Sequence, residues 1–131
     1  MNNHELALKS AQDHRERLES KADFVVDISM RNWSPTVPQL EKFCRDTYSG
    51  MVARFREMER NGHHAYFVNV LSGVNSGNGK NLAYSDSTGV VLEPIATHSA
   101  GWGLNNILES YKKNQEPFDL VLLSAARRKD N

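Results

Sequence analysis

The sequence is short of cysteine, of long apolar runs and of any surplus of charge. Its 131 residues include one cysteine, so no internal disulfide can form and we expect a reducing, cytoplasmic setting. No apolar run approaches the roughly 18 residues of a membrane span, and residues 1–21 lack the apolar centre of a secretory signal. Sixteen basic residues balance sixteen acidic ones, which argues against a nucleic-acid partner because such binders usually carry a basic excess.

Motifs for metal binding and for several kinds of catalysis are also missing. The histidines show no H-E-x-x-H or zinc-finger spacing, and Cys44 has no second cysteine with which to hold a metal. No G-x-S-x-G elbow of a serine hydrolase occurs. Gly79-Lys80 suggests a phosphate-binding P-loop, but the spacing from Gly73 is one residue too long and Asn81 replaces the required hydroxyl. We therefore expect no metal and no cofactor, and we predict a hairpin loop over 73–81.

What is present is the composition of one folded domain spanning residues 1–131. Hydrophobic residues make up 39% of the chain and charged residues 24%, which is enough to build a modest core. Apolar periodicity predicts helices over 3–22, 38–60 and 99–114, and strands over 24–30, 65–71, 82–85, 90–95 and 118–125. Residues 86–89 are predicted to be a turn, and residues 126–131 a polar tail. Thr36 and Gln39 have the spacing of a capping box.

The element order α-β-α-β-β-β-α-β predicts an α+β two-layer sandwich. Its sheet is expected to have about five strands, mixed or mostly antiparallel, with two helices packed on it and an N-terminal helix. That first helix, 1–22, has a thin apolar stripe of Ala7, Ala11, Leu18 and Ala22, so it buries little by itself. We expect it to be peripheral or to pair with a second copy of the chain.

Residues 97–103, between a strand and a helix, are a candidate anion site. Helix N-termini present free N–H groups to anions, and glycines let a ligand approach the backbone. The candidate binding residues are His98, Ser99, Gly101 and Gly103, with Lys80 from the loop. An alternative reason for these residues is structural: Ser99 can cap the helix, and glycine lets helix and sheet pack closely.

The order of three strands, a Gly-x-Gly helix start and another strand resembles the acyl-CoA pyrophosphate loop of the GNAT acetyltransferases, over about a third of the chain. The chain lacks the Arg or Gln that this family places before its glycines, and it lacks the family's further helix and two strands. The resemblance implies an enzyme or ligand-binding domain that holds a phosphate or CoA-like group at 97–103.

Three further features have competing interpretations. His63, His64 and His98 could serve acid–base chemistry in a nucleic-acid-processing protein, although the chain has no basic surplus. Cys44 lies on the apolar stripe of its predicted helix, which favours a buried core thiol over a nucleophile. Trp33 and Trp102 can cover the core or form a contact surface.

No catalytic constellation follows from these patterns, so the sequence leaves enzymatic activity open. The leading hypothesis is a non-catalytic interaction or regulatory domain that acts as a homodimer or through a protein partner. Two features motivate this hypothesis: the thin apolar stripe of the first helix and the apolar strands. Both suggest surface that needs a partner.

Overall fold

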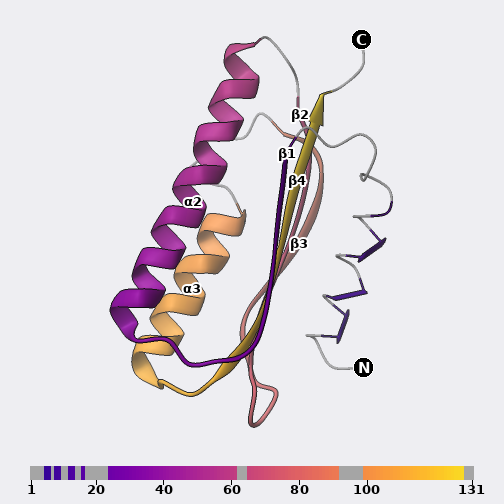
Figure 1. Cartoon of the computed structure of the whole chain (residues 1–131). Coiled ribbons are helices and arrows are strands. Elements are labelled where there is room, and N and C mark those ends of the chain that lie inside the picture. The colour runs from indigo at the N-terminus through magenta and orange to yellow at the C-terminus, as the bar shows by residue number, and fades with distance from the viewer. Residues whose placement is uncertain are drawn as a thin grey trace.

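A sheet of four long strands carries two helices on one face (Figure 1). The computed structural model describes residues 24–61, 65–91 and 99–128, and seven residues ahead of them: Glu5, Leu6, Leu8, Lys9, Gln12, Asp13 and Glu16. The elements are β1 (Phe24–Trp33), α2 (Val37–Arg60), β2 (Ala65–Asn75), β3 (Asn81–Val91), α3 (Ser99–Lys113) and β4 (Phe118–Arg128). The predicted α+β class and the two packed helices are confirmed.

The strands lie in the order β1-β4-β2-β3, and every pair of neighbours is antiparallel. It follows that β1 and β2 run in the same direction with β4 between them, and that β3 and β4 run in the same direction with β2 between them. Helix α2 joins the first pair and α3 joins the second. The fold therefore consists of two interleaved β-α-β units. In each unit, one strand of the other unit lies between the two parallel strands.

The prediction of five strands is wrong, because the described sheet has four. Residues 86–89 do not turn: they pair with residues 67–70 of β2, and β3 continues through them from Asn81 to Val91. The tight turn of this hairpin lies between Asn75 and Asn81, within the loop predicted over 73–81. The sequence Asp-Ser-Thr-Gly favours a turn locally, but a neighbouring strand of equal length offers it a full ladder of backbone hydrogen bonds.

The predicted N-terminal helix is only partly described. The seven described residues between Glu5 and Glu16 have helical backbone, and the remainder of 1–22 lies outside the described residues. Figure 1 places this segment across the sheet from α2 and α3. Leu8 packs there against Val70, Val121 and Leu123, which are buried on the second face of the sheet. The described residues of this segment thus add part of a third layer to the predicted two.

Helix α2 begins at a capping box, as the sequence predicted. The backbone N–H of Gln39 donates to Oγ1 of Thr36 at 3.2 Å, and the backbone N–H of Thr36 donates to Oε1 of Gln39 at 2.9 Å. These two bonds satisfy donors that a helix start otherwise leaves free. None of the helices in the described parts of the chain combines the length and hydrophobicity needed to span a bilayer.

The main core lies between the helices and the first face of the sheet. Its buried residues come from both helices and from three strands: Leu40, Cys44, Met51, Leu71, Ala83, Leu104, Ile107, Tyr111, Phe118, Leu120 and Leu122. The hydroxyl of Tyr111 donates to the backbone oxygen of Pro35 at 2.6 Å. This bond ties the end of α3 to the start of α2 and satisfies a buried hydroxyl.

Candidate functional site

The predicted anion site at 97–103 is described only from Ser99, where α3 begins. A Cβ atom at Gly101 would lie 2.5 Å from Cε2 of Tyr48, and one at Gly103 would lie 2.5 Å from Cδ2 of Leu71. A side chain at either position would therefore have to displace the side chain of Tyr48 or Leu71, so glycine suits the packing of α3 against α2 and β2. The contacts account for the Gly-x-Gly spacing without a ligand, as the structural interpretation of these residues anticipated.

Lys80, the residue assigned to that site from the loop, is not brought to it. Lys80 lies at the β2–β3 turn, where the backbone N–H of Ser76 donates to the carbonyl of Pro117 at 3.0 Å, just beyond the C-terminal end of α3. Ser99 lies at the opposite end of that helix (Figure 1). His98, and the pair His63 and His64, lie outside the described residues.

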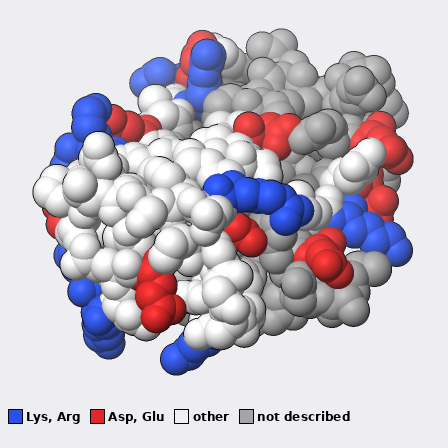
Figure 2. Space-filling view, turned by 60° about the horizontal axis from the view of Figure 1, so that its bottom comes forward, with Lys and Arg blue, Asp and Glu red and all other residues white. Residues whose placement is uncertain are grey.

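The β2–β3 turn is organised by its own amide side chains. Oδ1 of Asn75 accepts from the backbone N–H groups of Gly77 and Asn78 at 2.9 and 3.1 Å, and Nδ2 of Asn75 donates to Glu116. Oδ1 of Asn78 accepts from the N–H of Lys80 at 2.9 Å. Figure 2, which brings this end of the molecule forward, shows basic and acidic side chains interspersed with no dominant sign. The turn's Asn side chains are thus engaged in holding its own backbone.

The two tryptophans assigned to an interface have different environments. Trp33 is half-buried, and the centroid of its ring lies 5.2 Å from the ring centroid of Phe43 and 5.4 Å from that of Phe118. Trp102, in the first turn of α3, is 63% exposed. Trp33 therefore contributes to the aromatic edge of the core, whereas the indole of Trp102 is available to another molecule.

Cys44 is a buried core thiol, as its place on the helix stripe predicted. Only 8% of the residue is exposed, and its Sγ lies 3.7 Å from the carbonyl oxygen of Leu104, to which it donates. Burial raises the pKa of Cys44 to about 11. The thiol is therefore protonated at neutral pH, and it is not a nucleophile in the folded protein.

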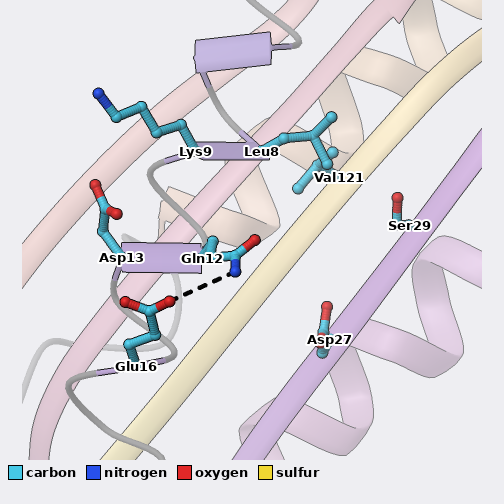
Figure 3. A pocket seen from close by; sticks show the side chains of 8 residues that line it. All are labelled: Leu8, Lys9, Gln12, Asp13, Glu16, Asp27, Ser29 and Val121. Carbon is cyan, nitrogen blue, oxygen red and sulfur yellow. Dashed lines mark hydrogen bonds between the residues drawn. The ribbon is translucent and has the colours of Figure 1, made fainter.

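A hollow lies between described residues of the N-terminal segment and the second face of the sheet (Figure 3). It has a volume of about 650 Å³ and is lined by Leu8, Lys9, Gln12, Asp13, Glu16, Asp27, Ser29 and Val121. Of the seven described residues of the segment, Leu8 is partly buried and the other six are exposed. Within the described parts of the chain, no group of His, Cys, Asp and Glu side chains is placed to hold a metal ion.

A second hollow, of about 400 Å³, follows one side of α2. Its lining residues are Tyr48, Ser49, Val52, Ala53, Arg56 and Arg60, which recur at helical spacings. Sequence reasoning missed this site. The spacing of two arginines along one side of the predicted helix was visible, but the lack of an ion pair between them and any described carboxylate was not.

Comparison with known proteins finds no relative: the chain matches no protein-family model, and no curated protein matches it. Besides the hollow beside the N-terminal segment, the described residues of the two helices offer two surfaces that could engage another molecule, the exposed indole of Trp102 and the arginine-lined hollow of α2.

Proposed function

We propose that the chain is a small interaction domain without catalytic activity, which binds a protein partner through the surface of α2 and α3 near Trp102. The observation that carries this proposal is the 63% exposure of Trp102, which lies in the first turn of α3. Tryptophan is among the residues most enriched in interface hot spots, and a rigid site for it lowers the ordering cost of binding.

The packing of α3 supports this role for Trp102. Its neighbours Gly101 and Gly103 hold the first turn of α3 tightly against Tyr48 and Leu71. The indole therefore projects from a turn fixed on both sides. The other exposed large apolar residues among those described, Leu6 and Tyr84, are 45% and 42% exposed, so Trp102 has the greatest exposure of the three.

The partner can be a second copy of the chain or another protein of a reducing, cytoplasmic compartment, where one free thiol is stable. A homodimer places the same surface on both subunits. The first experiment replaces Trp102 with the photo-crosslinker benzoylphenylalanine in the cells that make the protein. The control places the same group at Lys113, which is exposed at the far end of α3.

We expect crosslinking at position 102 and none at position 113. A product of twice the chain mass identifies self-association, and a product of another mass identifies a different protein. Equal crosslinking at both positions, or none at position 102, would overturn the proposal.

A further inference from the structure

We infer that the partner presents an acidic segment, and that this segment lies along the second half of α2, over the hollow lined by Tyr48, Ser49, Val52, Ala53, Arg56 and Arg60. The inference rests on the proposed function, because it names the chemistry of the protein that this face binds. The charges on α2, the shape of its surface and its continuity with the Trp102 surface support it.

The charges of α2 divide into two groups. Lys42 and Arg45 contact Asp46 at 2.6 and 4.0 Å, and Arg54 contacts Glu57 at 3.4 Å. Arg56 and Arg60 complete the five basic residues of the helix, and neither forms an ion pair with any described carboxylate. The two basic residues of α2 that form no ion pair with a described carboxylate are thus the two that line the hollow.

The spacing of the two arginines suits a pair of carboxylates. Residues four apart on a helix lie one turn apart, with a rise of about 6 Å. Carboxylates spaced four residues apart on a second helix have the same separation. A guanidinium can bind a carboxylate through two parallel hydrogen bonds. An arginine therefore holds a carboxylate in a more defined geometry than a lysine does.

The remaining lining gives the hollow an apolar part. Val52 and Tyr48 are half-buried and Ala53 is exposed. Burial in this environment raises the pKa of the Tyr48 hydroxyl. An occupant with carboxylates at one end and an apolar side chain at the other therefore matches the hollow better than a free anion does.

Tyr48 also joins this hollow to the Trp102 surface. Its ring forms part of the hollow and lies against Gly101, the residue next to Trp102. One segment lying along α2 could therefore contact both surfaces. A nucleic acid fits less well, because its binding depends on a surplus of basic residues along the strand and the chain carries no net charge.

The test uses the full chain and a fluorescein-labelled peptide of about 14 residues, or about four helical turns. The peptide carries two glutamates four residues apart and a leucine beside them, and a control peptide carries glutamines instead. Fluorescence anisotropy measures binding to the protein, to an Arg56→Gln/Arg60→Gln double variant, and to Arg54→Gln. The last variant removes a positive charge that Glu57 already pairs with.

We expect the glutamate peptide to bind the protein about tenfold more tightly than the glutamine peptide, which two charge-assisted contacts can supply. The double variant should lose this preference, and Arg54→Gln should keep it. Equal affinity for the two peptides would overturn the inference, as would a preference that survives in the double variant. Tighter binding of a short single-stranded oligonucleotide than of the glutamate peptide would also overturn it.

The crosslinker at position 102 separates this inference from the proposed function. If crosslinking persists undiminished in the Arg56→Gln/Arg60→Gln background, the partner binds near Trp102 without the arginines, and only the inference fails. If position 102 does not crosslink in any background, the proposed function fails. Loss of crosslinking in the double variant alone, with retention in Arg54→Gln, supports both.

Discussion

The two faces of the sheet are covered in different ways, and two adjacent residues show the contrast. Leu122 and Leu123 are 0% and 1% exposed, yet their side chains point to opposite faces of β4. Among the described residues, Leu122 lies beneath two helices in a cluster of eleven buried residues, whereas Leu123 belongs to a cluster of three against which Leu8 packs. Two equally buried leucines therefore need not contribute equally to stability. We expect the first face to contribute most of the free energy of unfolding.

The largest expected effect tests this contrast directly. Leu122→Ala should lower the free energy of unfolding by about 3–5 kcal/mol, because a cavity beneath two packed helices cannot collapse. Leu123→Ala should cost about 2–3 kcal/mol, because the described cover of the second face, a segment packed through Leu8, can move inward. Urea unfolding followed by circular dichroism measures both variants. A larger loss for Leu123→Ala would reverse the assignment of the faces.

The next effect concerns the N-terminal segment. Leu8→Asp should lower the free energy of unfolding by about 1–2 kcal/mol, because it places a charge against an apolar cluster. Its control is Leu6→Asp, since Leu6 is 45% exposed and its replacement should change stability by no more than about 0.5 kcal/mol. Thermal unfolding compares the two variants. Equal shifts in Tm would mean that the segment does not stabilise the second face through Leu8.

The smallest expected effect comes from one buried serine on each face. The hydroxyls of Ser72 and Ser124 are both buried and have no hydrogen-bond partner. Ser72→Ala and Ser124→Ala should each raise the free energy of unfolding by up to about 1 kcal/mol. Each substitution removes a polar atom that is buried away from water without a hydrogen bond. The control is Ser76→Ala, which loses a hydrogen bond to Asp119 and should not stabilise the protein. Destabilisation by either buried substitution would contradict this account.

Local patterns predicted much of the fold. The apolar spacing of residues 38–60 predicted α2, Thr36 and Gln39 predicted its start, and the place of Cys44 on that stripe predicted a buried thiol. Each of these features depends on residues within a few positions of one another. The same kind of reasoning failed at residues 86–89, where pairing with β2 overrides a local preference for a turn.

The candidate site was harder to predict because it depends on contacts between elements. The glycines of α3 suggested the approach of a ligand, but Tyr48 and Leu71 lie against them, from α2 and β2. The arginines of α2 look alike in the sequence, and only the folded helix separates Arg54, which contacts Glu57, from Arg56 and Arg60. Lys112, which reaches Glu41 across two helices at 3.8 Å, shows that such pairing cannot be read from local sequence.

The central position of β4 has a consequence for protein synthesis. The ribosome makes β1, α2, the β2–β3 hairpin and α3 before β4, yet β4 is the strand that joins β1 to β2. Until β4 emerges, β1 and the hairpin both present open edges that a neighbouring nascent chain could pair with. The sheet is completed by long-range contacts, which form slowly. Production of this protein should therefore respond to translation speed and to chaperones that shield unpaired strands.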